Sequence, residues 1–169
     1  LPWQKTTEDL LDIEHAKKSL NENHFGMDLI KDRVLEYISV MKLQKDKSPG
    51  EAIRAPILCF VGLVGTGKTT IAGAIAQALG RKFVRIPFGG LGEVAMLRGE
   101  PRFERRGEPG QVIKGMKRAQ TRNPVLLFDE IDRVDEKSRA SIMGALVEIL
   151  DPEQNKGFMD AYIDYPFDL

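Results

Sequence analysis

The most constraining feature of this sequence is a glycine-rich turn between an apolar run and a helix-like segment. Residues 62–69 fit the phosphate-loop pattern G-x-x-x-x-G-K-[ST]. The apolar run 57–61 is rich in strand-forming residues, and the helix-like segment 68–79 ends before Gly80. Because phosphate loops lie between a strand and a helix in this order, the sequence predicts a site for a nucleotide triphosphate.

Each residue type in this loop has a chemical role. Glycines let the backbone curve around an anion, so that successive N–H groups and the helix N-terminus face the phosphates. We expect Lys68 to reach the β- and γ-phosphates and to take part in catalysis, and the Thr69 hydroxyl to bind Mg²⁺. The predicted nucleotide contacts of the loop are Gly62, Leu63, Val64, Gly65, Thr66, Gly67, Lys68, Thr69 and Thr70.

A second apolar run, residues 125–130, ends in two acids. Strands that end at the carboxyl edge of a parallel sheet deliver their last side chains into the ligand crevice. We therefore expect Asp129 to hold Mg²⁺ together with Thr69, and Glu130 to polarise the attacking water as the catalytic base. The alternative is a core strand that runs into an acidic surface turn. Asp132 and Asp135 are expected to be surface acids or a helix cap.

The remaining pattern alternates helices and strands, which favours a parallel α/β sheet with right-handed crossovers and flanking helices. Loop 88–110 holds six glycines and is too long for a plain connector, so we expect it to be functional or mobile. The other expected elements are helices 12–20, 27–43, 111–120 and 138–150, a linker at 45–52, a strand at 82–87, a helical turn at 92–97, and an extended piece near 161–163.

Composition excludes some classes of protein. The chain has 169 residues, 42% of them hydrophobic, and zero formal net charge, so no global field favours nucleic acid or a membrane. Basic residues outnumber acidic ones by eight to three between Arg98 and Arg122, which leaves DNA binding open as an alternative to a solvated face. The single cysteine, Cys59, is expected to be buried and unpaired, as in a reducing compartment. No apolar run is long enough to cross a membrane.

The two histidines are weak signals. His15 is expected on the surface of its helix. His24 lies at a helix junction beside Phe25, where an aromatic edge and open backbone could hold an adenine. The predicted adenine contacts are His24, Phe25 and Gly26.

With these motifs in hand, the chain resembles the ATPase module of Lon proteases, which are ATP-dependent serine proteases of the AAA+ class. The resemblance covers nearly the whole chain. It rests on L-P-W at 1–3, H-F-G at 24–26, K-D-R-V-L-E-Y at 31–37, P-I-L-C at 56–59, G-R-K-F-V-R at 80–85, D-E-I-D at 129–132 and L-D-P-E-Q-N at 150–155. The last of these is the most diagnostic.

The resemblance implies ATP and Mg²⁺ as cofactors and a hexameric ring that threads unfolded or damaged proteins through its pore. The location it implies is the bacterial cytoplasm or the mitochondrial matrix. It divides the chain into a helical N-terminal segment, 1–52, and a truncated AAA+ large α/β subdomain, 53–169. The family's fourth strand, which lies between the first and third, and its small helical subdomain, arginine finger and protease domain are expected beyond residue 169.

The sequence departs from the family pattern in two places, each a pair of residues. Where the family has an aromatic–aliphatic pair that grips the substrate, this chain has Glu104 and Arg105, and the nearest aromatic residue is Phe103. Leu63 and Val64 replace two prolines in the phosphate loop. Altered substrate contact leaves a non-hydrolytic nucleotide switch or scaffold as one alternative to a protease motor. The basic run from Arg98 to Arg122 leaves a nucleic-acid-dependent AAA+ ATPase as the other.

Overall fold

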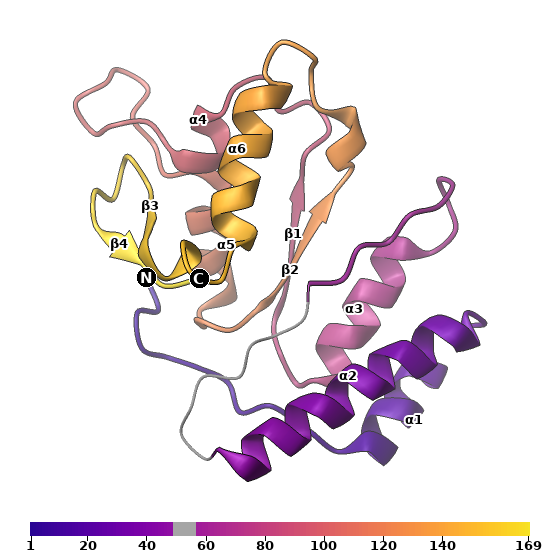
Figure 1. Ribbon diagram of the computed structural model, residues 1–169. Helices are drawn as coiled ribbons and strands as arrows, with labels where there is room; N and C mark the ends of the chain where they lie inside the picture. Colours follow the sequence, from indigo (N-terminus) through magenta and orange to yellow (C-terminus); the bar gives the residue numbers. More distant parts are fainter. Residues whose placement is uncertain (49–56) are drawn as a thin grey trace. The chain divides into compact units, whose positions relative to one another are not determined.

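A computed structural model describes residues 1–48 and 57–169, which form two compact units. One unit comprises residues 8–82, and the other comprises residues 1–7 and 83–169. The predicted boundary between residues 52 and 53 lies outside the described residues and stays a prediction. Figure 1 shows the order of helices and strands along the chain.

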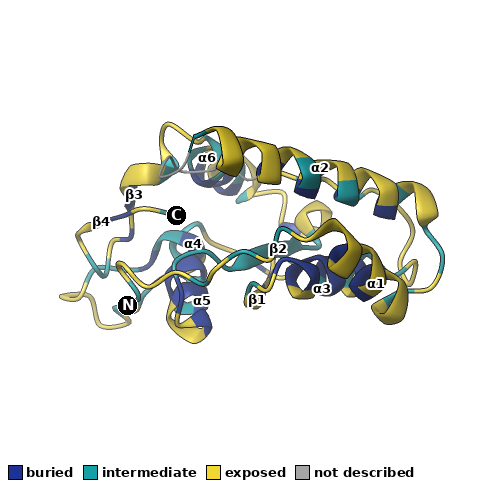
Figure 2. Ribbon diagram, turned by 90° about the horizontal axis from the view of Figure 1, so that it is seen from below, coloured by how far each residue is buried: buried dark blue, intermediate teal, exposed yellow. Residues whose placement is uncertain are grey.

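The unit of residues 8–82 is helical. It contains α1 (Ile13–Asn23), α2 (Asp28–Lys47) and α3 (Lys68–Ala78), and α1 packs against both of the others. Aliphatic and alanine side chains of α3 are buried almost throughout its length, whereas α2 buries a stripe that includes Val34, Ile38 and Met41 (Figure 2). The end of α3 is held by Arg81, which forms a two-pronged ion pair with Asp9 at 2.6 Å for each N–O contact.

Local hydrogen bonds explain the differences between the predicted and observed helices. Asp12 caps α1 by accepting from two backbone N–H groups. The predicted break at residues 21–23 is wrong: α1 continues to Asn23, whose side-chain amide donates to the Ser19 carbonyl at 2.7 Å. Helix α2 continues to Lys47, so the predicted linker at 45–52 begins inside it, and its residues 49–52 lie outside the described ranges.

The strand predicted at residues 57–61 is wrong. This segment belongs to no helix or strand, and Ile57 and Val61 are 59% and 93% exposed. Cys59 is likewise exposed, not buried as expected. A strand exists only where a neighbouring strand satisfies its backbone N–H and C=O groups. Across residues 1–48 and 57–169 the strand pairs are β1 with β2 and β3 with β4, so no described strand pairs with this run.

The unit of residues 1–7 and 83–169 has the predicted α/β character. Strands β1 (Phe83–Pro87) and β2 (Val125–Asp129) pair in parallel, with Phe83 opposite Val125 and Pro87 opposite Asp129. The connection between them runs through α4 (Ala95–Arg98) and α5 (Gln111–Ala119), and α5 packs on β1. The N-terminal segment joins this unit: the Arg122 amide donates to the Lys5 carbonyl, and Trp3 lies against Tyr165 and Phe167.

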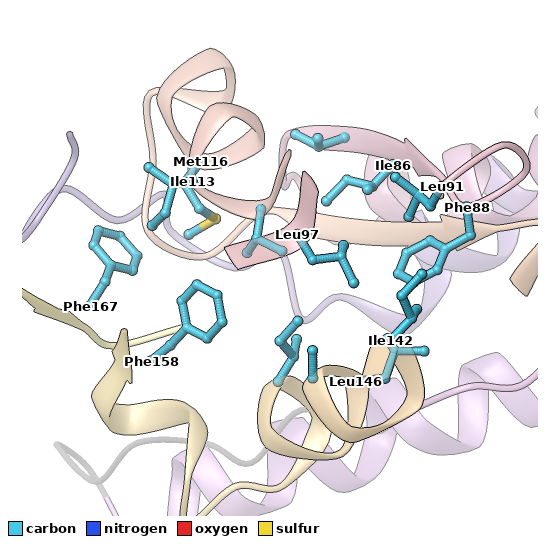
Figure 3. Close-up of a cluster of buried hydrophobic side chains, with 14 of the residues drawn as sticks. Ile86, Phe88, Leu91, Leu97, Ile113, Met116, Ile142, Leu146, Phe158 and Phe167 are labelled. Carbon is cyan, nitrogen blue, oxygen red and sulfur yellow. The ribbon is translucent and has the colours of Figure 1, made fainter. Parts of the chain in front are cut away.

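After β2 come the short 3-10 turn η1 (Ile131–Arg133), α6 (Arg139–Leu150), the 3-10 turn η2 (Asn155–Gly157) and a hairpin of β3 (Phe158–Met159) with β4 (Pro166–Phe167). The core of this unit collects apolar side chains from β1, α4, α5, α6 and the hairpin (Figure 3). Phe88, Ile86 and Leu97 are fully buried in it.

The extended piece predicted near 161–163 is wrong, because Asp160 turns the chain at this point. Its carboxylate is buried and accepts from the backbone N–H groups of Tyr162 and Ile163 at 3.0 Å each. It also accepts from the Gly110 amide at 2.7 Å, where loop 99–110 closes and where a Cβ would lie 1.9 Å from the Leu97 carbonyl oxygen. Asp160 therefore ties the closed end of this loop to the C-terminal hairpin.

We predict that Asp160→Asn loosens both segments. In the asparagine side chain, an NH₂ group replaces one of the carboxylate oxygens that accept from backbone N–H groups, so two donors face each other. This lowers the local stability by about 2 kcal/mol and speeds amide exchange by about thirtyfold. Hydrogen–deuterium exchange of peptides covering residues 99–110 and 160–163 measures this. Asp164→Asn is the matched control, since asparagine tolerates the positive φ of 51° at this exposed position. Unchanged exchange in Asp160→Asn would contradict the role of this carboxylate.

Candidate functional site

The loop of residues 62–67 has the backbone of an anion-binding turn. Gly65 and Gly67 have φ values of 82° and 87°, in the left-handed region that favours glycine. The Thr66 hydroxyl donates to the Leu63 carbonyl at 2.9 Å and closes the turn. Helix α3 then begins at Lys68, so the positive end of an 11-residue helix follows the loop directly. These features fit a phosphate group.

The two side chains that begin α3 are those that the motif requires. The Lys68 ammonium folds back over the loop and donates to the carbonyl oxygens of Gly62 and Leu63 at 2.7 Å each. Thr69 is half-buried in the first turn of α3, and the Thr70 hydroxyl donates to the Gly67 carbonyl. Leu63 and Val64 are more than four-fifths exposed, so their side chains leave the loop's backbone accessible.

His24 lies against this loop, within the same compact unit. A Cβ on Gly67 would be 2.7 Å from the His24 Nε2 atom, so the imidazole occupies the space that a larger residue at position 67 would need. The His24 carbonyl accepts from the buried Lys31 ammonium at 2.7 Å, which fixes the turn between α1 and α2. Phe25 is fully exposed. The adenine contacts at His24, Phe25 and Gly26 stay a prediction, and His15 is on the surface as expected.

The acidic pair lies at the end of β2, in the other unit. Asp129 is the last residue of β2, and its carboxylate accepts from the Arg85 guanidinium at 2.7 Å. Its backbone carbonyl accepts from the Phe88 amide at 2.7 Å, which extends the β1–β2 pairing by one bond. Glu130 follows with φ 58° and ψ 41°, and its carboxylate pairs with Arg133 at 3.0 Å. Asp132 and Asp135 are exposed, as expected of surface acids.

Two arginines at this site were missed by sequence reasoning. Arg85 is two residues before Pro87, which pairs with Asp129, so strand alternation puts Arg85 and Asp129 on the same face of the sheet. Arg133 is three residues after Glu130, the spacing of one helical turn. Both signals become visible only when the register and the turn are known. The proposed Mg²⁺ pair of Thr69 and Asp129 combines residues of both units and stays a prediction.

The loop of residues 99–110 presents its charged positions to solvent. Phe103 is 87% exposed, and Glu104 and Arg105 are exposed beside it. Within the basic stretch 98–122, several cations form ion pairs inside the same unit: Arg98 with Glu148, Lys114 with Glu108, and Arg122 with Asp168. Each of these three cations therefore has an acidic partner within its own unit.

The hexad considered most diagnostic makes a turn. Asp151 accepts from the Glu153 amide at 2.9 Å and from the Gln154 side chain at 2.6 Å, and these bonds lower its pKa below the ordinary value. Asn155 donates to the Ile149 carbonyl at 3.3 Å, while its own carbonyl accepts from the Leu169 amide. This segment therefore ends α6 and holds the C-terminal residues.

No helix in the described ranges, 1–48 and 57–169, is long and apolar enough to span a membrane.

The contact of His24 with Gly67 generates a test by double substitution. The Gly67→Ala substitution destabilises the loop in two ways, because alanine disfavours the left-handed φ and because its Cβ clashes with the imidazole. The His24→Ala substitution removes only the clash. We predict that Gly67→Ala weakens binding of a fluorescent ATP analogue about fivefold more when His24 is present, a coupling of about 1 kcal/mol. Gly73→Ala in α3, where the Cβ meets open space, is the control. Equal losses in both backgrounds would show that the contact has no effect.

Comparison with known proteins identifies the family. Residues 58–163 match the ATPase family associated with various cellular activities (AAA). The whole chain is 52% identical to part of a Lon protease of Lawsonia intracellularis and 48% identical to part of one of Clostridioides difficile. It is 46% identical to part of Lon protease 2 of Thermus thermophilus. The chain spans about a fifth of the length of these relatives (20%, 21% and 22%). The chain therefore belongs to the AAA family of ATPases, and over its whole length it is similar to one segment of Lon proteases.

Proposed function

We propose that this chain is the ATP-binding and ATP-hydrolysing part of a Lon-type ATP-dependent protease, in which hydrolysis drives the unfolding and translocation of protein substrates. The observation that carries the proposal is the loop of residues 62–67, whose left-handed glycines lead directly into α3 and Lys68. The similarity to Lon proteases over the full chain supports the protease assignment in particular.

The roles of the residues follow from their chemistry. Backbone N–H groups of residues 62–70 and the Lys68 ammonium hold the phosphates of ATP. The Thr69 hydroxyl and the Asp129 carboxylate hold Mg²⁺, which neutralises charge on the phosphates during hydrolysis. Glu130 orients the attacking water and accepts its proton. In this structure the Asp129 carboxylate accepts from the Arg85 guanidinium, so Arg85 and Mg²⁺ would share this carboxylate.

The proposal extends to assembly and location. The full-length protein forms a hexameric ring that acts on unfolded or damaged proteins, as expected of an AAA+ motor. The named relatives come from bacteria, which supports the bacterial cytoplasm as the location over the mitochondrial matrix.

A second candidate is a nucleotide switch or scaffold that does not couple hydrolysis to protein unfolding. The observation in its favour is the exposed, charged tip of loop 99–110, where Glu104 and Arg105 replace the expected apolar grip. A charged tip is solvated and makes weaker contact with an apolar unfolded chain than an aromatic residue does. Phe103 is the one exposed aromatic residue of this loop, which the structure describes in full.

We predict that Lys68→Ala in the full-length protein abolishes ATP turnover and ATP-driven proteolysis. Loss of the ammonium leaves the phosphate charge uncompensated and costs at least about a hundredfold in turnover. Steady-state phosphate release and cleavage of a labelled unfolded protein are the measurements. Lys82→Ala, an exposed lysine, is the matched control. Turnover that is unchanged in Lys68→Ala would remove the assignment.

We further predict that an unfolded protein substrate stimulates ATP turnover of the full-length protein by about twofold or more, because a motor hydrolyses ATP faster when substrate is bound. Phosphate release with and without a permanently unfolded protein measures this effect, and the folded form of the same protein serves as the control. Absence of stimulation, with ATP still bound, would favour the switch.

A further inference from the structure

Glu130 has a backbone conformation that its neighbours must maintain. Its φ of 58° and ψ of 41° lie in the left-handed region, which a residue with a Cβ adopts only at a cost in free energy. Residues held in such regions are typical of functional sites, where the surrounding structure fixes them. Asp129 before it is anchored in β2 and η1 begins immediately after it, so the direction of the Glu130 side chain is set from both sides.

The Glu130 side chain extends to Gly89. A Cβ built on Gly89 would lie 2.4 Å from the Glu130 Oε2 atom and 3.5 Å from its carboxyl carbon. Gly89 does not have a left-handed φ, whereas its neighbour Gly90 does, at 87°. The backbone at position 89 is therefore one that other residues adopt, and it is the close approach of the carboxylate that calls for glycine there.

Gly89 itself is firmly placed. The preceding residue, Phe88, donates its amide to the Asp129 carbonyl and buries its ring completely, 5.3 Å from the ring of Phe128. Gly89, against which the Glu130 carboxylate lies, is thus attached to the same strand pair that carries Glu130. The hydrogen bond of the Phe88 amide at the end of the β1–β2 pairing therefore limits how far Gly89 can move away from the carboxylate.

The other carboxylate oxygen contacts Arg133. The guanidinium Nη1 lies 3.0 Å from Glu130 Oε1, and the Arg133 amide donates to the Glu130 carbonyl at 3.0 Å. Since the two side chains are 54% and 36% exposed, this ion pair is weak by itself and orients the carboxylate more than it stabilises the fold. The two oxygens therefore have different neighbours, an arginine on one side and a glycine backbone on the other.

We propose that Gly89 and Arg133 are positioning residues that hold the Glu130 carboxylate in place for hydrolysis. We call these two contacts of the carboxylate, with Gly89 and with Arg133, the seat. The inference rests on the proposed function, in which Glu130 orients the attacking water. Gly89 acts by leaving room for the carboxylate, and Arg133 acts by holding one of its oxygens. Neither residue belongs to the phosphate loop, so the seat affects the rate of hydrolysis and leaves ATP binding unchanged.

The test compares Gly89→Ala with Gly92→Ala in the full-length protein. A Cβ at position 89 meets the mobile end of the Glu130 side chain, so the fold survives and the carboxylate is displaced; a Cβ at position 92 meets open space. A displacement of about 1 Å costs about a hundredfold in rate, so we expect kcat for ATP to fall at least about tenfold in Gly89→Ala with KM unchanged. Gly92→Ala should retain the wild-type kcat.

A second pair of variants tests the same seat from the side of Glu130. In a Glu130→Asp background the shorter acid no longer reaches position 89, so Gly89→Ala should lower kcat little further, and the two effects should be non-additive. Arg133→Gln should lower kcat about threefold, with Arg133→Lys recovering part of it.

The outcomes separate the seat from the proposed function. Glu130→Gln measured in parallel should bind ATP and not turn it over, and wild-type turnover in that variant would remove the catalytic assignment of Glu130 itself. If Glu130→Gln is inactive while Gly89→Ala keeps the wild-type kcat, the seat is wrong and the proposed function stands. Additive losses in the Glu130→Asp background, or a higher kcat in Arg133→Gln, would also overturn the seat.

Discussion

The parallel pairing of β1 with β2 is the interaction on which the arrangement around Asp129 and Glu130 depends. The register puts Pro87 opposite Asp129, and the Phe88 amide donates to the Asp129 carbonyl beyond the last strand residue of β1. This one bond brings Gly89 against Glu130, while strand alternation brings Arg85 to Asp129. A shift of the register by one residue would turn these side chains to the opposite face. The buried ring of Phe88, which packs against the partly buried ring of Phe128, opposes such a shift.

The phosphate loop depends on a different constraint, the left-handed backbone at Gly65 and Gly67. These two residues curve the chain so that α3 starts at Lys68, and the His24 imidazole leaves no room for a Cβ at position 67. The loop is supported from α1 and α2, because the buried Lys31 holds the turn that carries His24. The helical N-terminal segment is therefore part of the structure around the nucleotide site.

The loop of residues 62–67 and the acidic end of β2 each have a glycine at a position where a Cβ would meet a neighbouring side chain. Gly67 has a left-handed φ and also faces His24, whereas Gly89 needs only the space that Glu130 occupies. Loop 99–110 follows the same rule at its closed end, where Gly110 lies against the Leu97 carbonyl and Asp160 fixes it. At the tip of this loop Phe103, Glu104 and Arg105 are exposed to solvent, so charged residues there are compatible with the fold.

The sequence by itself determined the glycine turn before α3, the acidic end of β2, the α/β class and the main helices, because these follow from local patterns of glycine, charge and apolar spacing. It failed at residues 57–61, where strand-forming residues belong to no described sheet, and at residues 161–163, where the Asp160 carboxylate makes a turn. Only the tertiary structure decided the partners of the site residues, namely Arg85, Arg133, Gly89 and His24. The contacts of Arg85, Gly89 and His24 join positions far apart in the sequence, which only the tertiary structure brings together, and the contact of Arg133 with Glu130 depends on the turn of the chain at η1.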